Sequence, residues 1–358
     1  MNFDLTDEQE LLSETVRQFA AKECPPTRVR AIFDGEDGHD TGLWKGLLEL
    51  GLGAIAVPDE FGGAGLELLD LALAAEALGA GAVPGPFLGH SLAGLAIVFA
   101  GSDAQKKSWL PKLASGERLG TVAFAEGEGR WQPEDWTLDG GATLDGVKAH
   151  VPFGAQADLF VLGTRGGGLA LVERGARGLQ VEPLAGIDRT RRIAGLRFSG
   201  TPCETLPGGP AAAARVRDAG LVLLAADAFG GAAKLVEMSV EYAKTRQQFG
   251  VTIGSFQGLK HQLATMSVEV EPARGLYGSA AHAFDRVPDE SERSAALAKA
   301  HLTQVYMQIA RDAVEAHGGI GFTWESDIQI YFKRAMFDRA FLGTPAIHRE
   351  RAAALAGW

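Results

Sequence analysis

The stretch that decides the fold runs from Glu241 to Gln262 and reads EYAKTRQQFGVTIGSFQGLKHQ. Apolar residues recur at helical spacing from Arg215 to Lys244 and again beyond the stretch, so we expect two long helices that meet near Arg246. Glycines such as Gly250 permit a tight turn between these helices. An arginine close to an aromatic side chain, here Phe249, suits a phosphate group and a flat ring.

The corner also has a purely structural interpretation. Arg246 could bond the last carbonyl groups of the first helix, and Phe249 could simply belong to the core. A second stretch favours the functional interpretation. The segment EAHGGIGF, from Glu315 to Phe322, follows a predicted helix over Ala295 to Val314 and places paired glycines where the backbone can approach a ligand closely.

Together these motifs resemble the acyl-CoA dehydrogenase family. The chain has Arg-x-x-Phe-Gly at Arg246, then Gln257, then the glycine pair Gly318 and Gly319, in the order and at the spacing found in the C-terminal half of that family. The PDEFGGAG loop at residues 58–65 is also similar, and the resemblance covers nearly the whole chain. It implies FAD as the cofactor and an acyl-CoA thioester as the substrate.

Composition limits the partners and the compartment. The chain has 358 residues and a formal net charge of -11, which argues against nucleic acid as a main partner. We find no apolar run of about 18 residues and no signal-peptide pattern, so we expect a cytoplasmic protein without a membrane span. Cys24 and Cys203 lie far apart and form no CxxC pattern, so neither a thiol pair nor a metal site is predicted.

The hydrophobic pattern of the sequence divides the chain into three segments. Residues 1–116 are helical in pattern, residues 117–210 contain short β-type runs between glycine-rich turns, and residues 211–358 contain long helices. We therefore predict an α+β protein with an N-terminal helical domain, a middle β-barrel domain and a C-terminal four-helix bundle. This order is the one that the resemblance implies.

The catalytic base of the family is missing from the sequence. The resemblance implies a desolvated glutamate that removes a proton next to the thioester, while the flavin accepts a hydride. The two positions that carry this glutamate in the family correspond here to Leu342 and Gly220. Gly220 and Gly343 are compatible with a roomy cleft. The nearest acids, Asp218 and Asp227, lie too far round or along the helix to replace the base.

The segments that would contact the flavin ring are altered as well. Where the family has a Thr-Glu-Pro type loop, residues 124–130 read FAEGEGR. Where it has Trp-Ile-Thr-Asn beside the isoalloxazine ring, residues 150–153 read HVPF, so a stacking tryptophan and a hydroxyl donor are lost. Pro152 also lacks a backbone donor. We interpret His150 as a polar residue at a strand end rather than a catalytic one.

The motifs that remain intact share one role. In family structures they reach across the dimer interface to the adenosine and pyrophosphate of the neighbouring subunit's FAD. The corresponding residues here are Arg246, Phe249, Gln257, Gly318 and Gly319. The resemblance therefore favours a non-catalytic subunit that completes the FAD site of a paralogous chain. It is most similar to the base-lacking subunit of the α2β2 acyl-CoA dehydrogenases of bacterial steroid side-chain degradation.

Three alternatives stay open at this stage. The chain could be a self-sufficient homotetrameric dehydrogenase with an unusual base, such as Asp218, Glu126 or Glu128. It could instead be a non-enzymatic module that binds acyl-CoA or another protein. The segment GHSLAG at residues 89–94 resembles the nucleophile elbow of serine hydrolases, although Ser91 is better explained as a helix cap.

Overall fold

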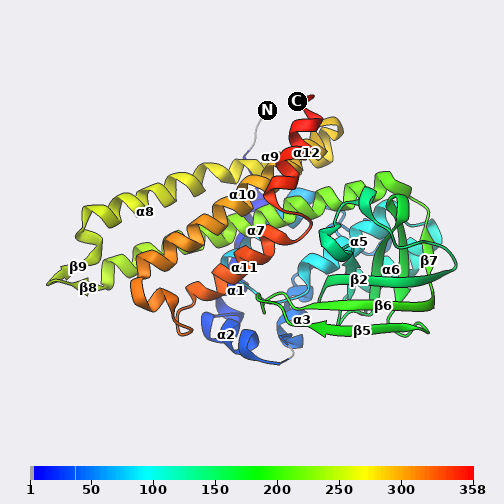
Figure 1. Cartoon of the computed structure of the whole chain (residues 1–358), viewed down its shortest axis with the longest axis horizontal. Helices are drawn as coiled ribbons and strands as arrows, with labels where there is room; N and C mark the ends of the chain where they lie inside the picture. The colour runs from blue at the N-terminus through cyan, green and yellow to red at the C-terminus, as the bar shows by residue number, and fades with distance from the viewer. Residues whose placement is uncertain (1–3, 37) are drawn as a thin grey trace.

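The computed structural model describes residues 4–36 and 38–358 of the chain (Figure 1). Helices make up the N-terminal part, as predicted, and they pack against the long C-terminal helices. The helices of this part are α1 (Asp7–Glu23), α2 (Pro26–Asp34), α3 (Thr41–Glu49), the short 3-10 turn η1 (Asp59–Phe61), α4 (Leu68–Ala80), α5 (Phe87–Ala100) and α6 (Asp103–Ala114).

Helix α1 has a defined start, end and buried face. Thr6 caps its N-terminus through a reciprocal capping box, and the helix stops just before Pro25. Leu11 is 67% exposed whereas Val16 is completely buried. The buried face is centred on Val16 and packs on α4, and Leu11 lies outside it.

Ser91 is neither a helix cap nor a nucleophile on a strand-to-helix turn. Helix α5 already begins at Phe87, directly after Pro86, so Ser91 lies inside the helix and is buried. A nucleophile elbow requires a sharp, strained turn that exposes the hydroxyl group. This segment therefore gives no support to the hydrolase alternative.

The middle part of the chain is β-rich, as predicted, but its hydrogen bonds form two sheets rather than one closed barrel. The strand orders are β1-β3-β4-β7 and β2-β6-β5. The pairing of β2 with β6 slips after Lys148, and the freed Ala149 N–H donates to the Ala125 carbonyl of the other sheet at 3.0 Å. The strands are β1 (Gly120–Ala123), β2 (Thr143–Pro152), β3 (Leu159–Thr164), β4 (Gly168–Glu173), β5 (Leu179–Leu184), β6 (Ile193–Pro202) and β7 (Glu204–Leu206).

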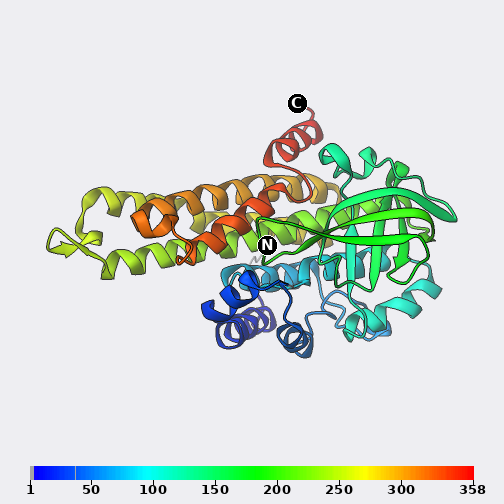
Figure 2. The same cartoon turned by 60° about the horizontal axis from the view of Figure 1, so that its bottom comes forward.

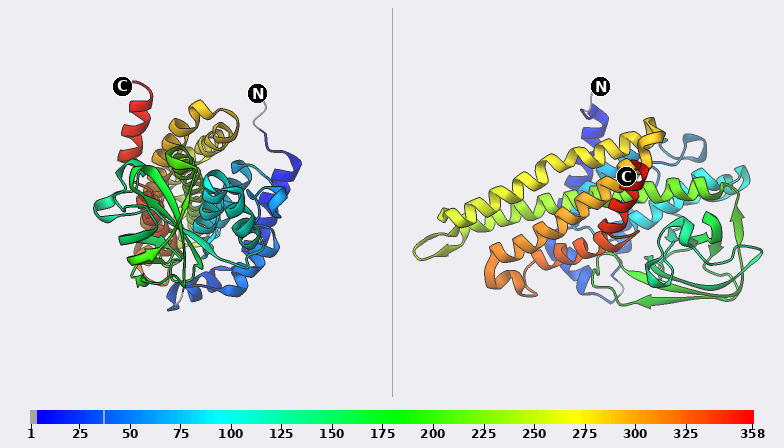
Figure 3. Two further views of the ribbon diagram at one scale, coloured as in Figure 1. Left: turned by 90° about the vertical axis from the view of Figure 1, so that its right-hand side faces the viewer. Right: turned by 45° about the horizontal axis from the view of Figure 1, so that its top comes forward.

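The C-terminal part is an elongated helical bundle that ends in a small hairpin (Figures 1 and 3). The domain boundaries after residues 116 and 210 remain predictions. The elements are α7 (Gly209–Thr245), β8 (Gln247–Gln248), β9 (Val251–Thr252), α8 (Gln257–Val270), α9 (Arg274–Arg286), α10 (Pro288–His317), the 3-10 turn η7 (Gly318–Phe322), α11 (Ile328–Ala340) and α12 (Pro345–Leu355). Short 3-10 turns also occur at η2 (Gly127–Gly129), η3 (Pro133–Asp135), η4 (Arg165–Gly167), η5 (Ile253–Ser255) and η6 (Glu271–Ala273).

Helix α7 is the central helix of the molecule. It packs along α4 of the N-terminal part and along α10 and α11 on its other side (Figure 2). By length and composition it could cross a membrane, but 83% of its most apolar window is buried, as in a core helix. A Cβ atom at Gly230 would lie 2.0 Å from the Glu76 carbonyl oxygen. The close approach of α4 and α7 therefore requires glycine at this position.

A buried ion pair joins the three parts of the chain. The Arg334 guanidinium of α11 donates to both carboxylate oxygens of Asp227 on α7, at 2.6 and 2.9 Å. Its remaining nitrogen donates to the Val83 carbonyl, at 3.1 Å, and to the Thr190 hydroxyl, at 3.0 Å. Burial opposes the charge on Asp227, but Arg191 and Arg334 outweigh this effect and lower the pKa of Asp227.

We expect Arg334→Met to lower the free energy of unfolding by about 3 kcal/mol, because it leaves part of a buried charge without its partner. Urea unfolding of the full chain measures this change. Arg165→Met is a matched control, since its ion pair with Asp139 lies in solvent, and it should leave the unfolding midpoint unchanged. Equal changes in the free energy of unfolding in the two variants would contradict the conclusion that Arg334 joins the three parts of the chain.

Candidate functional site

The corner between α7 and α8 projects from the end of the bundle (Figure 1). The backbone N–H of Arg246 donates to the Tyr242 carbonyl at 2.9 Å and closes the helix, while the Arg246 side chain is exposed. Phe249 lies between β8 and β9, has a left-handed φ of 53° and is 93% exposed. The interpretation of Phe249 as a core residue is therefore wrong.

The other predicted cofactor residues lie near the same end of the bundle. Tyr242 of α7 stacks on His317 of α10 with ring centroids 4.4 Å apart, and this contact joins the two helix ends. Gly318 and Gly319 follow His317 directly and are exposed, and so is Gln257 at the start of α8. A Cβ atom added at Gly318 or Gly319 would meet no other atom within 4 Å. Their backbone thus borders open space that a ligand can enter.

The two positions of the missing base lie against each other, although they are far apart in the sequence. A Cβ atom at Gly220 would lie 2.5 Å from Cδ1 of Leu342 and 3.3 Å from Cδ1 of Leu92. Leu342 is completely buried. Gly220 therefore does not open a roomy cleft, because the Leu342 side chain already fills the space.

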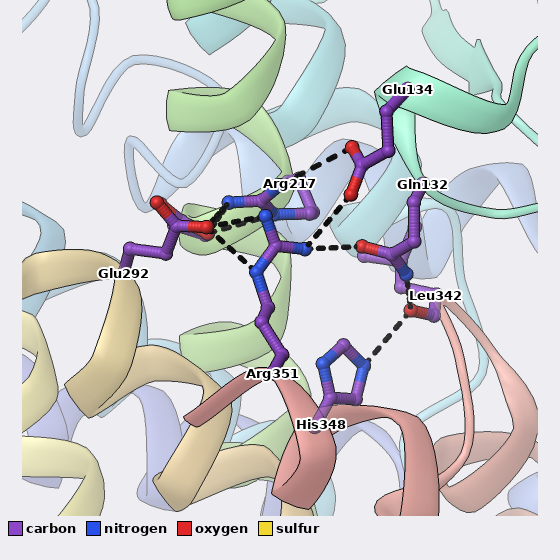
Figure 4. Close-up of polar contacts among 8 residues, drawn as sticks. Gln132, Glu134, Arg217, Glu292, Leu342, His348 and Arg351 are labelled. Carbon is purple, nitrogen blue, oxygen red and sulfur yellow. Dashed lines mark hydrogen bonds and ion pairs between the residues drawn. The ribbon is translucent and has the colours of Figure 1, made fainter. Parts of the chain in front are cut away.

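Hydrogen bonds hold the Leu342 backbone in a left-handed conformation, with φ of 59° (Figure 4). The Leu342 carbonyl accepts from Gln132 Nε2 at 3.2 Å and lies 3.0 Å from His348 Nε2. Burial and the charge of Lys299 lower the pKa of His348 to about 3, so its ring is neutral and Nε2 carries the proton. Arg351 in turn donates to the Gln132 side-chain oxygen at 2.6 Å. The loop is thus fixed from two sides.

Cations hold Asp227 and the two described acids, Asp218 and Glu126, that were considered as an unusual base. Arg334 and Arg191 pair with Asp227, and Arg217 Nε donates to Asp218 at 2.9 Å. The third acid is Glu126, which accepts from Lys148 Nζ at 2.6 Å. Burial raises the pKa of Asp218, whereas bonds from Lys148 and Thr137 overcome burial and lower the pKa of Glu126 to about 2. The side chain of Glu128 lies outside the described part of the structure.

Backbone groups of Pro152 and Phe153 in the segment at residues 150–153 form hydrogen bonds within the chain. The Phe153 N–H donates to the Arg192 carbonyl at 2.7 Å, and the Pro152 carbonyl accepts from the Thr121 hydroxyl at 2.6 Å. His150 is exposed and stacks on Trp131, with ring centroids 6.0 Å apart. No sequence pattern points to Trp131, because it lies in a loop without periodicity.

Backbone strain marks the same positions. In the described residues, left-handed φ angles occur at five residues other than glycine, and four of these are His150, Phe153, Phe249 and Leu342. The fifth is Ala82. All four lie in segments that the resemblance assigns to the flavin or the base. Such conformations cost free energy and persist only where the surrounding structure imposes them.

Comparison with known proteins identifies the class of this fold and site. Residues 6–117 match the acyl-CoA dehydrogenase N-terminal domain, and residues 212–356 match the acyl-CoA dehydrogenase C-terminal domain. The chain is 36% identical to the acyl-CoA dehydrogenase IpdE2 of Mycolicibacterium smegmatis over 342 residues, which cover 95% of this chain and 96% of that protein. The chain therefore belongs to the acyl-CoA dehydrogenase family.

Two solved structures are similar over almost the full length. A variant of the Tcur3481-Tcur3483 steroid ACAD is 30% identical, with a TM-score of 0.90 and coverage of 98% of both chains. The ChsE4-ChsE5 complex from Mycobacterium tuberculosis is 26% identical, with a TM-score of 0.89 and coverage of 100% of this chain and 99% of that chain. FAD is the cofactor of this family. The open backbone at Gly318 and Gly319 and the exposed Arg246 fit the adenosine and pyrophosphate half of FAD.

The contact between the two base positions can be tested by stability. We expect Gly220→Ala to destabilise the chain by about 1–2 kcal/mol, because the added methyl group overlaps Leu342. In a Leu342→Ala background the same change should instead stabilise the chain, by up to about 1 kcal/mol, through helix propensity. Urea unfolding of the four proteins of this cycle measures both effects. If Gly220→Ala changed the stability in the same direction in both backgrounds, the contact between Gly220 and Leu342 would be excluded.

The buried histidines predict a pH dependence. Burial lowers the pKa of His90 to about 4 and contributes most to lowering that of His348 to about 3. Below pH about 6.5 these histidines bind protons in the unfolded chain but stay neutral in the folded chain. The free energy of unfolding therefore falls as the pH decreases from about 6.5 towards 4. His348→Gln should reduce this slope by up to about 1.4 kcal/mol per pH unit. The exposed His261→Gln serves as the control, and equal slopes in both variants would refute the assignment.

Proposed function

We propose that this chain is the non-catalytic subunit of a heteromeric, FAD-dependent acyl-CoA dehydrogenase. The observation that carries the proposal is the packing of Leu342 against Gly220, since both base positions lack a carboxylate and the space between them is filled. The active site, with its glutamate, comes from a paralogous chain. The assembly is an α2β2 heterotetramer in the cytoplasm, and it catalyses the α,β-desaturation of an acyl-CoA thioester.

In this proposal the chain contributes one half of the partner's cofactor site. Arg246 pairs with the pyrophosphate, Phe249 and Gln257 contact the adenosine, and the backbone at Gly318 and Gly319 approaches the same half of the cofactor. FAD, when bound, supplies the hydride acceptor. The exposure of Phe249 supports this role, because 93% of this side chain is free to contact another molecule, although its ring also meets that of Phe256 edge-on.

The comparisons support the heteromeric assembly and the class of substrate. The ChsE4-ChsE5 structure is a complex of two differently named chains, and the Tcur3481-Tcur3483 protein is named a steroid ACAD. We therefore propose a steroid-derived acyl-CoA as the substrate of the complex. The described acids Asp218 and Glu126 are engaged by Arg217 and Lys148, which disfavours a self-sufficient enzyme that uses either of them as its base.

The role of the corner predicts a loss of flavin. Arg246→Ala should weaken FAD binding to the co-purified complex by about 10-fold or more, because it removes a charge-assisted contact with the pyrophosphate. The flavin-to-protein ratio, measured by visible absorbance after dilution and filtration, reports this change. Lys244→Ala is the control. Lys244 lies two residues before Arg246, is exposed and pairs with Glu241 on the same helix. An unchanged flavin content in Arg246→Ala would exclude the proposed role.

The full chain purified alone provides a second test. It should be nearly free of flavin and should not oxidise steroid acyl-CoA substrates, because it lacks a base at both family positions. A yellow protein with about one FAD per chain that oxidises an acyl-CoA without a partner would show a self-sufficient enzyme instead.

A further inference from the structure

An aromatic ladder crosses from the β sheets to the C-terminal helices. The Trp131 ring stacks on His150 of β2, with centroids 6.0 Å apart and planes inclined by 24°. Trp131 also meets Phe341 edge-on, with centroids 5.0 Å apart. Phe341 in turn stacks on Phe337 of α11, also at 5.0 Å, and the Arg191 guanidinium lies 5.4 Å from the Phe337 ring. One indole ring therefore connects the two parts of the chain.

The two ends of this ladder lie at the positions that matter for the chemistry of the family. His150 begins the segment that aligns beside the isoalloxazine ring, and Phe341 directly precedes Leu342 at a base position. In an active subunit the base and the flavin act on neighbouring carbons of the acyl chain, so flavin and acyl chain must lie between these two walls. In this chain the indole of Trp131 contacts both walls.

We propose that Trp131 occupies the flavin-ring position of this chain's own half-site and keeps that half-site closed. The inference deepens the proposed function and rests on it. In this proposal the chain lacks a base at both family positions, and its own site also excludes the flavin ring. A pair of chains consequently holds a flavin ring only in the site of the partner.

The loop that carries Trp131 is fastened on both sides of the residue. On one side the Glu126 N–H donates to the Arg130 carbonyl at 3.1 Å. On the other side Gln132 is buried, donates to the Leu342 carbonyl and accepts from Arg351 (Figure 4). Arg351 Nε is itself held by Glu292 at 2.7 Å. These bonds hold the loop so that Trp131 stays in contact with His150 and Phe341. Each aromatic contact adds about 0.5–1.5 kcal/mol of stabilisation.

The test uses the full chain and lumiflavin, a flavin ring without pyrophosphate or adenosine. Trp131→Ala should bind lumiflavin about 10-fold or more tightly than the wild-type chain, as measured by quenching of flavin fluorescence. Trp131→Phe, which keeps an aromatic ring in the gap, should bind as weakly as the wild type. Trp358→Ala, at a tryptophan that is 92% exposed, controls for the loss of an indole elsewhere. Equal affinity of Trp131→Ala and the wild type would overturn the proposal.

A measurement on the wild-type chain covers the case in which Trp131→Ala fails to fold. The chain carries six tryptophans, and fluorine NMR of the 5-fluorotryptophan-labelled protein resolves them, with Trp131→Phe assigning the signal. Excess lumiflavin should leave the Trp131 signal in place. A shift or exchange broadening confined to this signal would show that the indole leaves the gap for the flavin, which refutes closure.

The outcomes separate this inference from the proposed function. Lumiflavin has no pyrophosphate, so its binding does not depend on Arg246. If Arg246→Ala keeps its flavin while Trp131→Ala gains lumiflavin binding, the role of the corner is wrong and the closed ring site stands. If Arg246→Ala loses flavin and Trp131→Ala gains nothing, the subunit role stands and closure by Trp131 is wrong.

Discussion

The buried ion pair between Arg334 and Asp227 is the interaction on which the rest of the structure depends. It fixes α11 against α7, and through Val83 and Thr190 it ties both helices to the N-terminal helices and the β sheets. Gly220 lies on the same helix as Asp227, and Leu342 follows the helix that carries Arg334. The ion pair therefore also sets the relative position of the two base positions. A buried charge pair suits this purpose because it tolerates little misalignment.

The backbone is strained at the positions where the sequence departs from the family motifs. His150, Phe153 and Leu342 adopt strained left-handed conformations although none of them supplies the tryptophan, hydroxyl or carboxylate that the resemblance implies there. Contacts within the chain support these conformations, such as the bonds from Gln132 and His348 to the Leu342 carbonyl. The strain therefore persists because the surrounding structure imposes it.

The sequence predicted whatever depends on local spacing. Helical periodicity and glycines located the corner at Arg246, and alternation located the strands of the middle part. It could not predict the contact between Gly220 and Leu342, because packing across 122 positions leaves no periodic signal. Trp131 was missed for the same reason. The exposure of Phe249 and the division into two sheets also depend on tertiary structure, which overrides what an isolated segment suggests.

The contact between Gly220 and Leu342 couples the residue types that these two positions can hold. A glutamate at position 220 would collide with the leucine, whose Cδ1 already lies 2.5 Å from the place of a Cβ atom. A glutamate at position 342 would bring a carboxylate into a fully buried site, at a cost of several kcal/mol unless a partner appeared with it. Either substitution alone therefore costs stability, and this place in the fold accommodates a carboxylate only together with a compensating second change.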